Sequence, residues 1–368
     1  MARELYIGLM SGTSLDGVDA VLAEFAGGRP QLLAHAHHRF AAELRVELLR
    51  LNDGGSNELH RANVAAQHLA RGYAAAVEDL LLHAECEPAD VTAIGAHGQT
   101  VRHRPDAGYT IQLNAPAALA ELTGIDVIAD FRSRDVAAGG QGAPLVPAFH
   151  AALFTGVQPR AVVNIGGIAN LTGLPGAAGG RVIGFDCGPG NVLLDLWALE
   201  HLGEPIDRDG RWAAGGKADA ALLTALLAEP YFALPPPKST GRELFNAAWL
   251  NRALAGGHAE VDPQQVQATL TRLTAHSIGD ALRSHVADAA DVVVCGGGAF
   301  NRTLMSMLAA ECGGRPVRSS AELGIAPDHV EALAFAWLAW AHVNGLAGNL
   351  PAVTGARGPR ILGARYPR

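Results

Sequence analysis

A single carboxylate stands among glycines in residues 184–191, whose sequence is GFDCGPGN. Asp186 follows a short apolar run, and the glycines beside it leave room for a substrate to approach the backbone. A carboxylate in such a place suits a general base that takes a proton from a hydroxyl group or from water. The alternative is structural, because Asp before Gly-Pro is also a common turn former.

The first of two hairpin turns has the composition of a phosphate-binding site. In order, it contains Gly12, Thr13, Ser14, Asp16 and Gly17. Uncovered backbone N–H groups and hydroxyl donors can together bind phosphate oxygens. Asp16 or Asp19 could hold Mg²⁺ through water, since this ion favours one or two carboxylates together with phosphate oxygens. The alternative is an ordinary hairpin rich in turn formers.

Glycines also follow two later strands. The pair Gly166-Gly167 forms the second hairpin turn, where it allows close approach of a ligand or forms a plain bulge. The run Gly296-Gly297-Gly298 removes every side chain from one patch of surface, so a planar ring such as adenine can lie on the backbone. Asn301 belongs to this adenosine site or only caps the helix that follows.

Alternating strands and helices must position these turns, and the apolar spacing predicts where they lie. The expected strands are residues 5–10, 18–25, 32–39, 91–96, 109–113, 125–129, 161–165, 168–174, 181–185 and 292–294. The expected helices are residues 58–84, 116–123, 192–202, 218–227, 243–255, 263–286 and 328–343, with one more starting at residue 302.

The chain shows a weak internal duplication. A strand, a small-residue turn and a returning strand occur at residues 5–25 and again at residues 161–174. Two related α/β halves of this kind describe a clamp, and 368 residues suffice for two domains of roughly 100–200 residues each. We expect an N-terminal lobe of residues 1–137 plus a C-terminal helix and tail at about 340–368. Residues 138–339 would form the second lobe, with the adenosine-binding segment.

Composition narrows the functional classes. Hydrophobic residues make up 49% and charged residues 17%, which is typical of a chain with sizeable cores. The net charge of −8 and the lack of a Lys/Arg run argue against a nucleic-acid partner. We expect a cytoplasmic protein with no membrane partner, because no export signal or apolar span of about 20 residues occurs. The four well-separated cysteines, Cys86, Cys187, Cys295 and Cys312, are expected to be reduced.

These signals together resemble the actin, Hsp70 and sugar-kinase superfamily. Its members have two ribonuclease-H-like domains, with mixed sheets flanked by helices, and bind ATP in the cleft between them. Longer segments are similar to anhydro-N-acetylmuramic acid kinases, and the resemblance covers nearly the whole chain. These segments are GLMSGTSLDG (8–17), AHGQT (96–100), ADFR (129–132), GQGAP (140–144), GFDCGPGN (184–191), KSTGRE (238–243) and TGARGPR (354–360).

The resemblance implies a kinase that uses ATP and Mg²⁺ in peptidoglycan recycling and amino-sugar catabolism. It would convert 1,6-anhydro-N-acetylmuramic acid and water into N-acetylmuramic acid 6-phosphate, with ADP as the second product. Asp186 matches the family's catalytic carboxylate, which activates the water that attacks the anomeric carbon. Asp130 also follows a strand and is the rival base.

The resemblance also implies a set of sugar-binding residues. Thr100 and Glu331 match positions that touch the sugar, although Glu331 would also suit the first turn of a helix. Arg132 or Arg134 would pair with the lactyl carboxylate, for which an Arg fork is well shaped. His97 lines the same pocket or only satisfies loop backbone.

The chain departs from the wider superfamily at the first turn. Sugar kinases usually carry an Asp just before the Gly-Thr pair, whereas Leu9, Met10 and Ser11 fill that stretch here. The metal ligand must therefore come from elsewhere, and Asp16, acting through water, is the tentative choice. Thr240 and Glu243 have the spacing of a capping box, which predicts only the start of a helix.

Two other functions stay open at this stage. A non-catalytic ATP-dependent switch of the actin or Hsp70 kind would lack sugar-dependent turnover. An ordinary hydroxyl kinase would phosphorylate N-acetylmuramic acid without consuming water. The expected partners are the sugar and ATP, and the sequence leaves a homodimer open.

Overall fold

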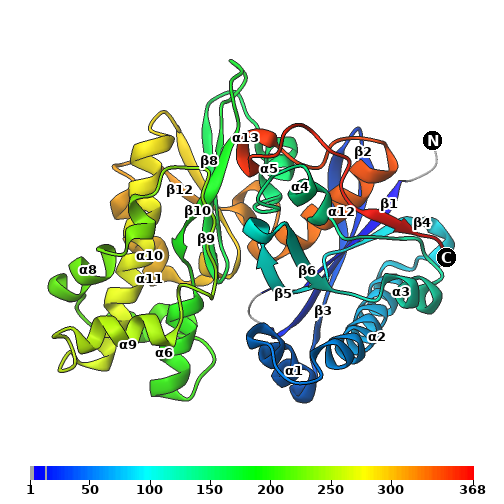
Figure 1. The fold of residues 1–368 in the computed structure, drawn as a ribbon. Coiled ribbons are helices and arrows are strands. Elements are labelled where there is room, and N and C mark those ends of the chain that lie inside the picture. The colour runs from blue at the N-terminus through cyan, green and yellow to red at the C-terminus, as the bar shows by residue number, and fades with distance from the viewer. Residues whose placement is uncertain (1–3, 13–14) are drawn as a thin grey trace. The chain divides into compact units, whose positions relative to one another are not determined.

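The computed structural model describes residues 4–12 and 15–368, so Thr13 and Ser14 of the first turn lie outside the described residues. The chain folds into two compact units (Figure 1). Met1–Leu153 and Asp328–Arg368 make up the first, and Phe154–Pro327 makes up the second. Residues 138–153 and 328–339, which we expected in the second lobe, are therefore part of the first unit.

The first unit is built on a mixed sheet with the strand order β13-β7-β4-β1-β2-β3. Its strands are β1 (Leu5–Met10), β2 (Gly17–Ala26), β3 (Arg29–Arg39), β4 (Val91–Ala96), β7 (Val127–Ala129) and β13 (Ala364–Tyr366). Strands β1, β4 and β7 are parallel, whereas β2, β3 and β13 run antiparallel to their neighbours. A separate hairpin of β5 (Gln99–Arg104) and β6 (Tyr109–Leu113) follows β4.

Helices flank this sheet, and the side chains along each strand point alternately to its two faces. The helices are α1 (Ala42–Asp53), α2 (Glu58–Ala84), α3 (Pro116–Thr123), α4 (Ser133–Ala137), α5 (Val146–Phe154), α12 (Val330–Val343) and α13 (Pro351–Thr354). Leu5, Ile7 and Leu9 of β1 belong to the same buried cluster as the apolar side of α2.

Helix α12 packs on the other face of the sheet, at backbone distance. A side chain at Gly8 of β1 would come within 1.9 Å of the Ala332 carbonyl oxygen. A side chain at Gly95 of β4 would come within 2.0 Å of the Phe335 carbonyl oxygen. Glycine is therefore required at both positions, because the obstructing atoms belong to the helix backbone and cannot move aside.

The second unit repeats the strand order of the first. Its sheet runs β10-β9-β8-β11-β12, with β8 (Arg160–Ile165), β9 (Ile168–Leu174), β10 (Ile183–Pro189), β11 (Asp291–Cys295) and β12 (Val317–Ser319). Strands β8, β11 and β12 are parallel, and β9 and β10 are antiparallel to their neighbours. In both units the first five strands of the sheet thus follow the order third, second, first, fourth, fifth, and the first unit adds β13 beside β7. The internal duplication expected from the sequence is confirmed.

Helix α10 is the centre of the second unit. It packs against β9 and β10 and against α6, α7, α8 and α11, and most of its residues from Val266 to Leu282 are buried. The unit's helices are α6 (Val192–Leu202), α7 (Arg211–Gly215), α8 (Ala220–Leu227), α9 (Ala247–Ala255), α10 (Pro263–His285) and α11 (Arg302–Glu311). Across residues 4–12 and 15–368, no helix has both the length and the apolar character that a membrane span requires.

Several elements confirm the predicted bounds, including α2, α3, α6, β4, β6 and β9. Two predictions near the candidate site are wrong. The strand expected to stop before Asp186 continues as β10 to Pro189, which an edge strand tolerates because no neighbour needs its missing N–H. The helix expected from Glu243 begins at Ala247, where the Asn246 side chain accepts the N–H of Trp249 at 3.0 Å.

Candidate functional site

Asp186 lies in the edge strand β10, directly beside a β-bulge. Its side chain is buried, and its Oδ2 atom accepts the backbone N–H of Thr240 at 3.0 Å. Its own N–H donates to the Lys238 carbonyl oxygen at 3.1 Å, and its carbonyl accepts the Tyr231 hydroxyl at 2.8 Å. Two neighbouring segments therefore cover this strand edge and hold both the backbone and the carboxylate of Asp186.

The two segments are also tied to each other. Lys238 Nζ donates to the carbonyl oxygens of Tyr231 and Phe232, both at 3.2 Å, and lies 4.8 Å from the centroid of the Tyr231 ring. Burial lowers the pKa of the Lys238 ammonium. Burial and the nearby Asp186 carboxylate raise the pKa of Tyr231, so its hydroxyl keeps the proton that it donates. The capping-box interpretation of Thr240 and Glu243 is wrong, since the Thr240 N–H binds Asp186.

A row of polar residues crosses the sheet from Asp186. In the strand ladder Asp186 is opposite Asn170, Asn170 is opposite Asn164, and Asn164 is opposite Cys295. Directly paired residues share a face of a sheet, and the Cys295 thiol donates to Asn164 Oδ1 at 3.8 Å. Neighbouring strands lie about 4.8 Å apart, so the row from Asp186 to Cys295 is about 14 Å long.

Two buried polar atoms near Asp186 have no hydrogen-bond partner in the part of the chain that the structure describes. They are the side-chain oxygens of Asn170 and Thr240. Buried polar atoms in proteins are nearly always satisfied, by protein, water or a ligand. The surroundings of Asp186 therefore suit a polar ligand such as a sugar or a water molecule.

The second hairpin turn packs against the start of α6. The Gly166 carbonyl accepts the Asn191 N–H at 2.8 Å, and the Gly167 carbonyl accepts the Gly190 N–H at 2.9 Å. A side chain at Gly190 would come within 2.3 Å of the Gly166 oxygen, so glycine is needed there. Asn191 also donates its side-chain amide to the Ile165 carbonyl at 3.1 Å.

The three glycines after β11 have different surroundings. A side chain at Gly296 would approach Asn164 Oδ1 to 2.4 Å, and one at Gly298 would approach Ile165 to 2.3 Å. Gly297 is exposed, and the nearest atom to its absent side chain is Asn191 Nδ2 at 3.7 Å. The turns at residues 166 and 297 thus meet at Asn191.

Asn301 occupies the position of a helix cap. Its Oδ1 accepts the backbone N–H of Leu304 at 2.9 Å at the start of α11. The capping role that the sequence allowed is therefore present, and a contact of Asn301 with nucleotide stays a prediction.

In the first unit, hydrogen bonds from α2 and from the start of β5 hold the described part of the first turn. The Ser11 hydroxyl lies 2.6 Å from the Tyr73 hydroxyl and donates to the Gly98 carbonyl at 3.0 Å. The Gln99 side chain donates to the Gly12 carbonyl at 3.1 Å. Burial raises the pKa of Tyr73, so this phenol stays protonated.

The two candidate metal carboxylates differ in their surroundings. Asp16 is exposed beside the first turn. Asp19 lies within β2 and its Oδ1 is 2.7 Å from His37 Nδ1, while burial raises the pKa of the Asp19 carboxyl. Within residues 4–12 and 15–368, no group of three or more His, Cys, Asp or Glu side chains could hold a metal ion. An exposed carboxylate beside this turn fits Mg²⁺ that is held mainly by phosphate oxygens and water.

Ser11, His97 and Asp130 follow the parallel strands β1, β4 and β7 of the first unit. They lie at the carboxyl ends of these parallel strands, which is where ligands bind in open α/β sheets. His97 is buried, its Nδ1 lies 3.3 Å from the Ser11 carbonyl oxygen, and its Nε2 lies 3.0 Å from an Arg132 nitrogen. Burial and the Arg132 charge hold the pKa of His97 well below its usual value. The imidazole is therefore neutral, with Nδ1–H donating to Ser11 and Nε2 accepting from Arg132.

The neutral His97 orients Arg132, whose guanidinium also donates to the Gly142 carbonyl at 2.8 Å. Arg134 is exposed on α4, and Glu331 is half-buried in the first turn of α12. Thr100 Oγ1 accepts the Gln112 side-chain amide at 3.2 Å.

Asp130 has a left-handed backbone conformation, with φ of 59°, and is exposed. Its Oδ1 accepts the Ser133 hydroxyl at 2.5 Å. The rival base is thus exposed to solvent, whereas Asp186 is buried in a hydrogen-bonded strand edge.

Comparison with known proteins decides the family. The family model for anhydro-N-acetylmuramic acid kinase matches residues 4–368. A curated relative of that name from Bordetella petrii is 60% identical over 99% of this chain and 96% of its own length. Another from Cupriavidus pinatubonensis is 57% identical over 99% of this chain and 98% of its length. The chain belongs to the anhydro-N-acetylmuramic acid kinase family.

The fold of this family member is similar to that of two solved structures. Component A of (R)-2-hydroxyglutaryl-CoA dehydratase from Acidaminococcus fermentans has a TM-score of 0.51 at 14% identity, covering 91% of this chain and 96% of that one. The activator of 2-hydroxyisocaproyl-CoA dehydratase from Clostridium difficile, with bound ADPNP, has a TM-score of 0.50 at 12% identity, covering 93% and 96%. These likenesses concern the fold alone. The predicted fold class, mixed sheets flanked by helices in two related halves, is confirmed.

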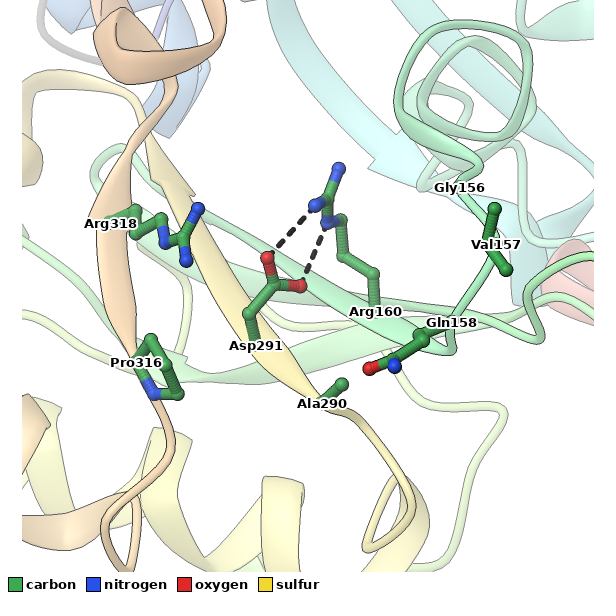
Figure 2. Close-up of a pocket in the computed structure, with 8 residues that line it drawn as sticks. All are labelled: Gly156, Val157, Gln158, Arg160, Ala290, Asp291, Pro316 and Arg318. Carbon is green, nitrogen blue, oxygen red and sulfur yellow. Dashed lines mark hydrogen bonds and ion pairs between the residues drawn. The ribbon is translucent and has the colours of Figure 1, made fainter.

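In this family member, a pocket of about 430 Å³ in the second unit lies at the amino-terminal ends of β8 and β11 (Figure 2). Arg160 begins β8 and Asp291 begins β11, and the two side chains form a paired contact at 2.8 Å for each bond. The glycine turns at residues 166 and 297 follow the other ends of the same strands. The pocket is therefore separate from the candidate site.

Sequence reasoning missed several residues of this site in the family member. Asn164 and Asn170 are polar residues inside strands, and their positions in an apolar run were the available signal. Tyr231 and Lys238 gave no spacing that links them to Asp186, because the link depends on the path of the chain along β10. The KSTGRE segment carried the resemblance, yet its contact with Asp186 was not foreseen.

Proposed function

We propose that this chain phosphorylates 1,6-anhydro-N-acetylmuramic acid with ATP while adding water across the anhydro bridge. The products are N-acetylmuramic acid 6-phosphate and ADP. The reaction would serve the recycling of cell-wall sugar. The observation that carries this proposal is the buried Asp186 carboxylate, fixed by the Thr240 N–H beside two unpartnered polar atoms. Membership of the family supports it.

Asp186 is proposed to act as the general base. It takes a proton from water, the water oxygen bonds to the anomeric carbon, and the bond from that carbon to O6 breaks. The released O6 bonds to the γ-phosphorus of ATP, the bond to the β-phosphate oxygen breaks, and ADP leaves. The proton on Asp186 then returns to solvent. Because the reacting groups must be in line, most of the rate gain comes from positioning and electrostatics.

The first unit is proposed to bind the sugar. Arg132 suits the lactyl carboxylate, because its planar fork is already oriented by His97 and Gly142 and can offer paired N–H donors. Arg134 is the exposed alternative for the same carboxylate. Thr100 and Glu331 would contribute further polar contacts, and His97 would act by orienting Arg132.

The glycine turns are proposed to bind ATP. The turn with Gly12, Thr13, Ser14, Asp16, Gly17 and Asp19 would receive the phosphates, and Gly166-Gly167 would do so from the second unit. The exposed Gly297, flanked by Gly296, Gly298 and Asn301, would lie under the adenosine. Mg²⁺ would be held by Asp16 through water, because Asp16 is exposed directly beside the first turn. Because ATP is the donor, we place the reaction in the cytoplasm.

An isotope experiment tests the proposed reaction. Purified protein is incubated with ATP, Mg²⁺ and the anhydro sugar in ¹⁸O-water, and the products are analysed by mass spectrometry. We expect one ADP per phosphosugar and a single ¹⁸O atom on the anomeric carbon. Phosphorylation of N-acetylmuramic acid without label would instead identify an ordinary hydroxyl kinase. ATP hydrolysis that ignores the sugar would point to a nucleotide switch and overturn the proposal.

A further inference from the structure

Lysine is rare in this chain. Of its 28 basic residues, only Lys217 and Lys238 are lysines. Lys217 is exposed, whereas Lys238 is half-buried and its ammonium donates to two carbonyl oxygens and covers an aromatic ring. A compact ammonium suits two converging carbonyls better than a planar guanidinium does. The contacts of Lys238 thus call for an ammonium at this position.

The Lys238 side chain turns toward the side of β10 that carries Phe185 and Cys187. Together with Phe232 and His285, these residues line a cavity of about 310 Å³. Phe185 and Cys187 belong to the buried cluster against α10, while Asp186 belongs to the polar row with Asn170. A lysine in a kinase segment would ordinarily suggest a phosphate ligand, but this ammonium is engaged in the cavity behind the strand.

The contacts of Lys238 close a ring of hydrogen bonds around Asp186. Asp186 binds the Tyr231 hydroxyl and the Lys238 carbonyl through its backbone, and Lys238 Nζ returns to the Tyr231 carbonyl. Thr240, two residues further along, donates its N–H to the Asp186 carboxylate. The three prolines at residues 235–237 join the two segments and limit the conformations open to the connection.

We propose that Lys238 is a positioning residue that clamps residues 238–240 onto the Tyr231 turn, so that the Thr240 N–H fixes the plane of the Asp186 carboxylate. This inference rests on the proposed function, because Asp186 must be the base. Removal of the ammonium leaves two carbonyls without their donor and loosens the segment that carries Thr240. The carboxylate is then held less well in line with the attacking water.

Chemical rescue provides a test with a matched control. Lys238→Ala is expected to lower kcat by about 10- to 100-fold, with the KM for ATP changed little. Propylammonium has the three carbons and the charge that this variant lacks, and the cavity behind β10 can admit it. It should restore much of kcat, whereas 1-propanol, of similar shape and without charge, should not. Lys217→Ala, at the exposed lysine, should behave as the wild type.

The pH profile separates positioning from a general loss of folding. In Lys238→Ala the acid limb of kcat/KM should move to higher pH by about one unit, because a hydrogen bond and a positive charge that favour the carboxylate form are weakened. Lys238→Met, which keeps the bulk of the side chain, should show the same shift and serves if the alanine variant folds poorly.

Three results would overturn the inference: a kcat within about twofold of wild type, a loss of kcat without a shifted acid limb, or rescue by 1-propanol as well. Failure of the proposed function looks different. In that case the wild type itself gives no labelled phosphosugar, or Asp186→Asn retains turnover, whatever Lys238 does.

Discussion

The two units share a strand order but differ in what they place at the ends of their parallel strands. In the first unit β1, β4 and β7 are followed by Ser11, His97 and Asp130. In the second unit β8 and β11 are followed by Gly166-Gly167 and Gly296-Gly297-Gly298. The carboxyl ends of the strands carry polar side chains in the first unit, whereas in the second unit they carry glycines that leave the backbone exposed.

This difference teaches how a duplicated fold can divide two binding tasks. The proposed sugar carries a carboxylate and an acetamido group, which need directed side-chain donors and acceptors. The Arg132 guanidinium, oriented by His97, is proposed to bind the carboxylate. A planar base needs a flat surface, which glycines provide. Asp186 departs from this pattern, because it is a carboxylate in the unit that otherwise offers backbone, and it is held by a segment outside the sheet.

The largest effect is expected from Asp186→Asn. The amide cannot take a proton from water, so kcat should fall by about 10²- to 10⁴-fold. ATP binding, measured by isothermal titration calorimetry, should stay within about twofold, since the glycine turns are untouched. Asp130→Asn is the matched variant for the rival base. If that variant loses turnover while Asp186→Asn keeps it, the base belongs to the first unit and the comparison must be redrawn.

An intermediate effect is expected from Gly297→Ala. The added methyl group meets no atom closer than 3.7 Å, so the protein should fold normally. It would nevertheless cover the backbone on which adenosine is proposed to lie, which should raise the KM for ATP about tenfold. Gly156→Ala, with nothing within 4 Å of its added carbon, is the control in the same unit. A raised KM for the sugar instead of ATP would reverse the assignment of the two edges.

A separate effect concerns stability in acid. Burial lowers the pKa of His150 to about 3, and burial with Arg132 lowers that of His97. Unfolded histidine binds a proton below a pH of about 6.5 while these folded groups stay neutral, so stability falls as pH drops. Each group should cost up to about 1.4 kcal/mol per pH unit between pH 6.5 and its lowered pKa.

Hydrogen exchange can show which unit responds. Among the described residues both buried histidines belong to the first unit. Amide protection, corrected for intrinsic rates, should therefore fall more in β4 than in β11 between about pH 7.5 and 5.5. His150→Gln should reduce the loss in β4. Equal losses in both strands would show that the two units unfold together.

Much of the fold could be predicted from the sequence, because its elements are long or sharply bounded. Helix α2 has 27 residues of regular apolar spacing, and β9 is bounded by Gly166-Gly167 and by a Pro-Gly pair. Helix α1 was missed because its apolar face is narrow, with only Leu48 and Leu51 buried. β13 was missed because its three residues are a strand only through pairing with β7, over 230 positions away.

The candidate site was less predictable than the fold. Asp186 and the glycine turns could be found because each is unusual in its own stretch of sequence. The roles of Thr240 and Asn191 could not, since each acts through a contact with residues about 25 to 54 positions away. Local spacing even favoured the wrong role for Thr240, as a capping box needs only three residues of context.

The placement of α12 has a consequence for synthesis on the ribosome. The helix that packs directly on Gly8 and Gly95 is encoded more than 230 residues after either strand. While the chain emerges, one face of β1 and β4 stays exposed until α12 has been synthesised. The residues of the second unit are contiguous, so this unit can complete its own core first. The half of the protein that begins first is therefore the half that finishes last, and a premature stop before residue 330 would leave that sheet face bare.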